Sequence, residues 1–440
     1  MSFSIPLLIK RLLFGVLLIG LMLPALQTQF QLLDPPEELG GYAEAAPKPE
    51  FNWPSLLDNS FQPAFERYME EQIGFREVLI RLRNQVAYSV FRVSKANKVL
   101  VGGDDVLFDE TAIRAYLGQD FKGLDNIRPN VRRFKVVQDT LARHGVLLVF
   151  AIAPDKANFY PEHFPAYFQQ LPRSQSNYQA YAQEMKARGV NVIDLAAAFQ
   201  QWKDTASYPL FPRGGIHWSG YGITLAADTL FHYIEQRGHL DLADFRSTGR
   251  EVVDETHDTD NDVAKAMNLL VPPAPFRMAY PHIAFDPPKP GQVKPNLLVV
   301  GDSFNWGLIG FYPFYTTLFD KFQFWYYNQE IAYGNSLTRP GQTQVSQLDR
   351  KAELLAQRVI LVLFTQHNLG GFDGNFSADM YSLLSPYSPA AEARIKDIEQ
   401  ELQRSPAVQD SLWQRANRTK TDYGGLLHAE AVQQYELQQL

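Results

Sequence analysis

Two consecutive segments of the chain repeat the order helix, glycine, buried strand, and this order limits the fold more than any other feature. Residues 131–145, VRRFKVVQDTLARHG, have the apolar spacing of a helix and lead into the apolar run VLLVFAIAP at 146–154. Residues 176–189, SNYQAYAQEMKARG, are the second expected helix and lead into VNVIDL at 190–195. Helix and strand alternating in this way predict an α/β fold, a parallel sheet flanked by helices.

Two further apolar runs end in polar residues. They are LLVVGDSF at 297–304 and RVILVLFTQHN at 358–368. Ligand sites of open α/β sheets lie at the carboxyl ends of the strands. We therefore expect GDSF, TQHN and the PDK of residues 154–156 to lie at one edge of the sheet.

The N-terminus predicts a membrane anchor. Lys10 and Arg11 directly precede an uncharged apolar run at 12–26, which has the length of a signal sequence and is slightly short of a membrane span. The uncharged QTQFQLL that follows can complete the span. We expect residues 1–30 to be an uncleaved anchor, with the basic side in the cytoplasm and the body in the periplasm of a bacterium. A cleaved signal peptide is the alternative.

Composition divides the rest of the chain. A tether rich in Pro, Gly and Ala is expected at 31–55, followed by one catalytic domain at 56–385. A charged, Pro-rich insertion interrupts this domain at about 247–293, and a helical tail occupies 386–440.

Charge and cysteine content exclude several classes of function. The net charge of −7 argues against nucleic-acid binding, which needs a basic face. The absence of cysteine excludes disulfides, thiolate nucleophiles and cysteine-based metal sites. The histidines are scattered, and the acidic segment at 254–262 lacks the glycine and the distal glutamate of an EF-hand. We expect neither a metal nor a cofactor.

The Gly-Asp-Ser that follows the expected strand at 296–300 predicts a nucleophile. Such a turn exposes the Ser303 hydroxyl and offers backbone N–H groups to an oxyanion, and Gly301 permits close approach of a substrate. The alternative is a capped turn that opens a helix. His217, in the glycine-rich stretch FPRGGIHWSGYG, is the natural base for this serine.

Four stretches together resemble a known family. VGGDDVLF, AIAPDKANFYPEHFP, GGIHWSGYG and LLVVGDSF, in this order, are similar to the extracytoplasmic SGNH-hydrolase-like polysaccharide O-acetyltransferases of the alginate O-acetyltransferase AlgJ/AlgX group. The resemblance covers residues 50 to 385. It implies an SGNH-like fold, with Ser303 as nucleophile and His217 as base. It also implies a polysaccharide acceptor and a multi-pass membrane O-acyltransferase that supplies acetyl groups.

One residue departs from the family pattern. The family has an acidic residue two positions before the histidine, where this chain has Gly215. A carboxylate behind the imidazole fixes its tautomer and stabilises the imidazolium. Three explanations stay open: a carboxylate from elsewhere, a carbonyl or amide that orients the ring, or an attenuated enzyme that binds rather than catalyses. For the first we favour Asp155, with Asp194 and Asp204 as alternatives.

Other residues near the expected sheet edge are candidate oxyanion donors or substrate contacts. SGNH enzymes use an asparagine on a neighbouring loop, a role that Asn368 or Gln366 can take, while His367 reads as an ordinary loop residue. Dense aromatics at 311–335 suggest a carbohydrate groove or a packed core. The remaining candidates for this edge are Asn305, Trp218 and Tyr327. Trp218 can alternatively be a residue of the apolar core.

These residues predict an O-acetyltransferase that works through a serine acyl-enzyme. Two other functions are compatible with the same residues. A carbohydrate esterase would use water as the acceptor, and a scaffold subunit would bind the polysaccharide without catalysis.

Overall fold

The structure is a computed structural model that describes residues 5–31, 33, 38–41, 46–333, 343–384, 387–419 and 422–438. Part of the expected tether therefore lies outside the described residues. The chain divides into two compact units, which we describe separately. One comprises residues 1–101 and 261–274, and the other residues 102–260 and 275–440. The boundary near residue 101 replaces the expected one near 56, because the helices of residues 61–91 and the segment 261–274 form a body of their own.

The larger unit is built on a six-stranded sheet. Its strand order is β4-β3-β10-β7-β8-β9, and all neighbours are parallel except β8 and β9. The strands are β3 (Leu147–Ala153), β4 (Val192–Asp194), β7 (Leu297–Gly301), β8 (Phe322–Tyr326), β9 (Glu330–Tyr333) and β10 (Val359–Thr365). The predicted α/β class is confirmed, and the four apolar runs of the sequence are β3, β4, β7 and β10.

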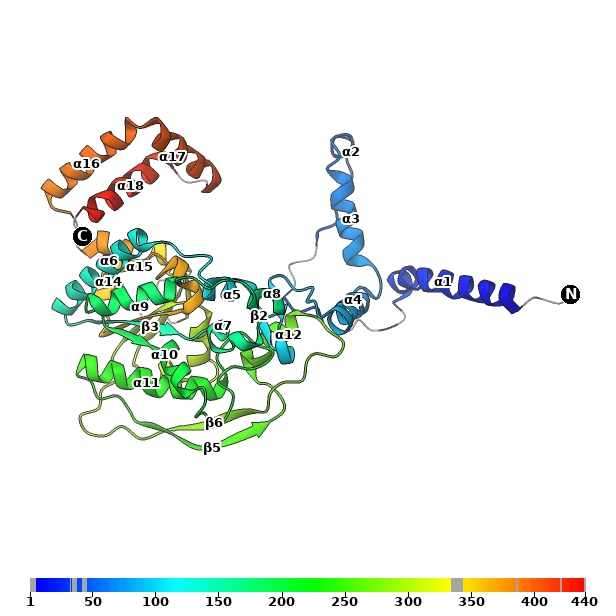
Figure 1. The fold of residues 1–440 in the computed structure, drawn as a ribbon, viewed down its shortest axis with the longest axis horizontal. Helices are drawn as coiled ribbons and strands as arrows, with labels where there is room; N and C mark the ends of the chain where they lie inside the picture. The colour runs from blue at the N-terminus through cyan, green and yellow to red at the C-terminus, as the bar shows by residue number, and fades with distance from the viewer. Residues whose placement is uncertain are drawn as a thin grey trace. The chain divides into compact units, whose positions relative to one another are not determined.

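Helices cover both faces of this sheet (Figure 1). Alternate residues of β3, β7 and β10 enter two separate apolar cores, as expected for strands buried on both sides. One core packs against α10 (Leu195–Trp202), α11 (Gly220–Gly238) and α13 (Phe314–Leu318). The other packs against α6 (Leu124–Arg143), α9 (Asn177–Ala187), α14 (Arg350–Leu355) and α15 (Phe376–Leu384).

Two glycines end the helices that lead into β3 and β4. Gly145 follows α6 and Gly189 follows α9, and both have a positive φ. A left-handed residue just past a helix reverses the chain at little cost only when it is glycine. The glycines therefore turn each helix directly into its strand.

The remaining elements of the larger unit are short or peripheral. The expected insertion forms a two-stranded antiparallel ribbon of β5 (Phe245–Val253) and β6 (Met278–Phe285). The short elements are β2 (Leu107–Asp109), α5 (Glu110–Tyr116), α7 (Lys156–Phe159) and α8 (Ala166–Gln169), with single 3-10 turns at Gly103–Asp105, Pro161–His163, Asp258–Asn261, Ser303–Leu308, Val345–Gln347 and Gln366–Gly371.

The C-terminal tail is a small helical bundle with its own apolar core. Its helices are α16 (Pro389–Gln403), α17 (Pro406–Thr419) and α18 (Tyr423–Leu437). A buried carboxylate joins the bundle to the sheet domain. Glu436 of α18 accepts from Arg133 of α6 at 2.6 Å and from the Tyr387 hydroxyl at 2.7 Å.

The smaller unit contains α1 (Ile5–Phe30), α2 (Trp53–Leu57), α3 (Phe61–Gln72), α4 (Arg76–Phe91), β1 (Val99–Val101) and α12 (Asp262–Ala266). By length and composition, residues Leu7–Phe30 of α1 can cross a membrane. This finding is consistent with the predicted N-terminal anchor.

Candidate active site

Ser303 lies in the 3-10 turn that directly follows β7. Gly301, the last residue of β7, has no room for a side chain, because a Cβ there would lie 2.1 Å from the Leu363 carbonyl oxygen of β10. Asp302 is fully buried, and its carboxylate accepts from the backbone N–H of Phe304 at 3.1 Å and of Thr365 at 2.7 Å. The Gly-Asp part of the motif therefore fixes the turn that presents Ser303.

His217 lies beside Ser303. Its Nε2 is 2.9 Å from the Ser303 hydroxyl oxygen, and both side chains are partly exposed. The imidazole also contacts the ring of Phe304, with 4.9 Å between ring centroids. A nucleophile at hydrogen-bond distance from a base is the geometry that acyl transfer needs.

Trp218 gives a second link between the same two segments. Its indole is fully buried, and its Nε1–H donates to the Phe304 carbonyl oxygen at 3.2 Å. The packing role that the sequence left open for Trp218 is therefore the one that the structure shows. Two adjacent residues of the histidine turn thus hold two adjacent residues of the serine turn.

Lys156, the lysine of the PDK motif, fixes the turn before His217. Its buried ammonium group donates to the carbonyl oxygens of Arg213 and Gly215, each at 2.8 Å. A buried charge is stabilised only when its hydrogen bonds are made. Sequence reasoning missed this residue, although a lysine directly after a buried strand was a usable signal.

The structure gives a steric reason for a glycine at position 215. A Cβ at this position would lie 2.5 Å from the Thr259 carbonyl oxygen and 2.9 Å from the carbonyl carbon of Asp260. The backbone of the acidic segment thus occupies the space that a side chain at 215 would need. Asp260 itself is fully buried and accepts from the Tyr280 hydroxyl at 2.9 Å.

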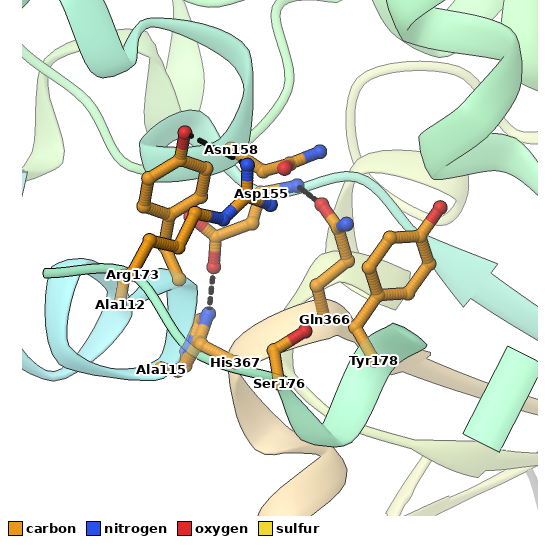
Figure 2. Close-up of a pocket in the computed structure, with 10 residues that line it drawn as sticks. Ala112, Ala115, Asp155, Asn158, Arg173, Ser176, Tyr178, Gln366 and His367 are labelled. Atoms are coloured by element: carbon orange, nitrogen blue, oxygen red, sulfur yellow. Dashed lines mark hydrogen bonds and ion pairs between the residues drawn. The ribbon is translucent and has the colours of Figure 1, made fainter. Parts of the chain in front are cut away.

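Asp155, the residue that we expect behind His217, contacts two other residues. Its carboxylate accepts from the Ala157 N–H at 2.7 Å, capping α7, and pairs with Nδ1 of His367 (Figure 2). The other two candidates lie elsewhere. Asp194 caps α10 and accepts from the Tyr178 hydroxyl at 3.0 Å, and Asp204 is exposed.

His367 is a partly buried residue paired with a carboxylate rather than an ordinary loop residue. Burial lowers the pKa of its imidazole, but the adjacent Asp155 carboxylate outweighs burial and raises the pKa to about 9. The pair lies in a cavity of about 20 Å³, which holds about one water molecule. Gln366 accepts from the Asp155 N–H at 2.8 Å in the same place (Figure 2). This cavity is too small for a sugar.

Asn368 and Tyr327 lie next to the serine turn. The Asn368 amide donates to the Asp302 carboxylate at 2.8 Å and to the Tyr327 hydroxyl at 3.2 Å. Burial and then the Asp302 carboxylate raise the pKa of Tyr327, so its hydroxyl stays protonated at neutral pH. Both side chains are partly exposed.

Asn305 is fully buried and already bonded. Its amide donates to the carbonyl oxygens of Asp302 at 3.1 Å and of Leu363 at 3.3 Å, and it accepts from the Tyr315 hydroxyl at 3.1 Å. Of the two candidate asparagines, Asn368 is therefore the one at the accessible edge.

In the described part of the chain, no group of three or more His, Cys, Asp or Glu side chains is placed to hold a metal ion. The chemistry that these residues offer is proton transfer between Ser303 and His217.

Replacing Gly215 should damage the protein rather than restore a missing acid. We expect Gly215→Ala to lower the free energy of unfolding by about 1–3 kcal/mol, because the new methyl group collides with the backbone of residues 259–260. Gly215→Asp should be at least as unstable. Gly371→Ala is the control, because a Cβ at 371 meets nothing within 4 Å. A Gly215→Asp protein as stable as the parent would contradict this account.

The Asp155–His367 pair should make stability depend on pH. A folded-state pKa of about 9 lies above the ordinary 6.5, so the pair stabilises the fold fully below pH 6.5 and its contribution is lost as the pH rises through 9. This contribution is on the order of 2 kcal/mol. Denaturant unfolding at several pH values should show the loss in the parent and in a His232→Gln control, but not in His367→Gln. An unchanged slope in His367→Gln would refute the assignment.

Comparisons with known proteins agree with the site. Residues 99–314 match the family model described as "SGNH hydrolase-like domain, acetyltransferase AlgX". The probable alginate O-acetylase AlgJ of Pseudomonas aeruginosa is 29% identical over 221 residues, covering 50% of this chain and 52% of that protein. Its counterpart from Azotobacter vinelandii is 29% identical over 187 residues, covering 42% and 46%. The chain thus matches about half the length of these curated relatives.

Two solved structures are also similar. The O-acetyltransferase domain of Pseudomonas putida AlgJ has a TM-score of 0.43 at 20% identity, covering 65% of this chain and 99% of that one. Pseudomonas aeruginosa AlgX has a TM-score of 0.43 at 15% identity, covering 66% and 68%. Ser303 and His217 both lie inside residues 99–314, the segment of this chain that matches the SGNH hydrolase-like domain model and is similar to the AlgX and AlgJ acetyltransferase group.

Proposed function

We propose that this protein is an extracytoplasmic O-acetyltransferase that moves acetyl groups onto hydroxyls of an exported polysaccharide through an acyl-enzyme on Ser303. The observation that carries the proposal is the 2.9 Å separation between the Ser303 hydroxyl oxygen and Nε2 of His217. The family of residues 99–314 and the similarity to probable alginate O-acetylases support the choice of acetyl group and acceptor.

In the first half of the reaction, the hydroxyl oxygen of Ser303 attacks the acetyl carbonyl carbon of the donor ester. His217 takes the hydroxyl proton on Nε2 and gives it to the departing donor oxygen as the ester bond breaks. In the second half, a sugar hydroxyl attacks the acetyl-serine, and its proton passes through His217 back to Ser303. No net oxidation occurs, and the product is an acetylated sugar.

Negative charge develops on the acetyl oxygen in both halves, and a nearby donor should stabilise it. Asn368 is our candidate, because one N–H of its amide is anchored to the Asp302 carboxylate, one residue from the nucleophile, and the other, which donates to the Tyr327 hydroxyl, can transfer to the oxyanion. A donor that is already oriented stabilises the transition state without reorganisation. The protonated hydroxyl of Tyr327 is a second candidate, for the sugar or the oxyanion.

The position of His217 is set by the scaffold around it. Lys156 holds the carbonyl oxygens of Arg213 and Gly215, before His217 in the chain, and Trp218, the residue after it, is bonded to Phe304. These contacts fix where the ring lies without any side chain at position 215. We therefore favour a working catalyst over an attenuated binding subunit.

Membrane anchoring supplies the setting for the reaction. We place α1 across the bacterial inner membrane and the catalytic unit in the periplasm, because Lys10 and Arg11 precede the span. Acetyl-CoA is cytoplasmic, so an acetyl group must cross the membrane before it reaches Ser303. The partner that we propose for this transfer across the membrane is a multi-pass membrane O-acyltransferase.

Removing the nucleophile should abolish transfer while the fold persists. We expect Ser303→Ala to lower acetyl transfer to an oligosaccharide by at least about a thousandfold and to lose covalent labelling by a sulfonyl fluoride. Ser382→Ala, an exposed serine of α15, should keep both activities. Unchanged transfer and labelling in Ser303→Ala would rule out this serine and favour a scaffold role.

The acceptor separates a transferase from an esterase with the same residues. The full chain in detergent, supplied with an acetyl ester, should release acetate slowly on its own. Adding an oligosaccharide should divert acetyl groups onto sugar hydroxyls, measured by mass spectrometry, and His217→Ala should suppress both products. Acetate as the sole product across a range of exported polysaccharides would establish the esterase instead.

A further inference from the structure

Helix α4 leaves most of its large aliphatic side chains exposed. Its buried residues are Asn84, Ala87 and Tyr88. Four of its aliphatic residues are exposed, with exposed fractions of 38% for Val78, 49% for Leu82, 47% for Val86 and 66% for Val90, whereas Ile80 is half-buried. A helix in water normally buries its aliphatic stripe and exposes its polar face.

The four exposed side chains form one continuous surface, which we call the α4 stripe (Val78, Leu82, Val86, Val90). They are spaced four residues apart, so at 3.6 residues per turn they cover an arc of about 120°. Leu79 lies within this arc and is exposed as well. The arc also contains one exposed polar residue, Ser89, so it is a mainly apolar face rather than a set of scattered exposed residues.

The inner face of α4 is held in place by polar contacts within the same unit. The Asn84 amide donates to the Met267 carbonyl oxygen at 2.8 Å, and the Gln85 side chain accepts from the Val271 N–H at 2.8 Å. These bonds fix the rotation of the helix about its axis. The α4 stripe therefore points away from its own unit for a structural reason.

The turn before α4 is bonded to the end of the candidate membrane span. The Thr28 hydroxyl, in the last turns of α1, accepts from the Gly74 N–H at 2.7 Å. A Cβ at Gly74 would lie 2.4 Å from the Pro24 carbonyl oxygen, so the two segments touch. Since α4 begins at Arg76, two residues later, it starts where α1 leaves the membrane.

The charges of α4 suit a lipid surface. The helix contains three arginines, Arg76, Arg81 and Arg83, and one acidic residue, Glu77. Arginines beside an aliphatic face are typical of helices that lie in the plane of a membrane containing anionic lipids. Phe91, at the end of the helix, is also exposed.

We propose that α4 is an in-plane membrane helix whose α4 stripe is immersed in the outer leaflet of the anchoring bilayer. The inference rests on the proposed anchoring of α1 and adds a second contact between the smaller unit and lipid. The occupant is a phospholipid surface, chosen because the stripe starts at the end of the span and carries basic residues. A second copy of the chain and a membrane protein are the competing occupants.

The natural sequence contains no cysteine, which makes site-specific labelling direct. Full-length Leu82→Cys, Val86→Cys and Val90→Cys proteins would each carry one environment-sensitive fluorophore. They would be reconstituted into vesicles of phosphatidylethanolamine and phosphatidylglycerol with nitroxide-labelled acyl chains. Leu17→Cys in α1 is the lipid reference, and Trp413→Cys, an exposed apolar residue of α17, is the water reference.

We expect labels on the α4 stripe to be quenched by the nitroxide lipids several-fold more than the Trp413→Cys label. Quenching of the stripe no greater than at residue 413, with residue 17 strongly quenched, would overturn the proposal and leave the anchor intact. Shielding of the stripe from a water-soluble quencher without quenching by lipid would also overturn it, in favour of a protein occupant. An unquenched label at residue 17 would remove the anchor itself, and the in-plane helix with it.

Discussion

The buried carboxylate of Asp302 organises the whole catalytic edge of the sheet. It accepts from the backbone of the serine turn at Phe304, from the end of β10 at Thr365 and from the Asn368 amide. An uncompensated buried carboxylate would be costly, so these three donors must stay where they are. One side chain thus sets the relative positions of the nucleophile and the proposed oxyanion donor.

Local patterns in the sequence were sufficient for the fold and for the reacting pair. Gly145 and Gly189 mark the two places where a helix must turn sharply into a strand, and the apolar runs beside them predict the parallel sheet. Ser303 and His217 could be singled out because the stretches GGIHWSGYG and LLVVGDSF resemble a family in which such a serine and histidine react together. Their 2.9 Å contact could not be predicted from local patterns, because 86 residues separate them.

The rest of the site depends on contacts that no local pattern reveals. Asp155 looked like the partner of His217 because both were expected at one edge of the sheet. However, β3 lies next to β10, and the Asp155 carboxylate at the end of β3 pairs with His367, which follows β10. Gly215 looked like a lost acid until the backbone of residues 259–260 was seen to fill its space. The role of Lys156 could not be predicted for a similar reason, because its acceptors are backbone carbonyl oxygens, which every residue carries.

The double link between residues 217–218 and 303–304 has an evolutionary consequence. The proposed reaction uses His217 and Ser303, whereas Trp218 and Phe304 hold the two turns together through an indole bond to a main-chain oxygen. Selection can therefore alter or discard the reactive pair while the adjacent bond keeps the two turns in place. A lineage descending from such a protein has a short path from enzyme to sugar-binding subunit, through substitutions that leave its architecture unchanged.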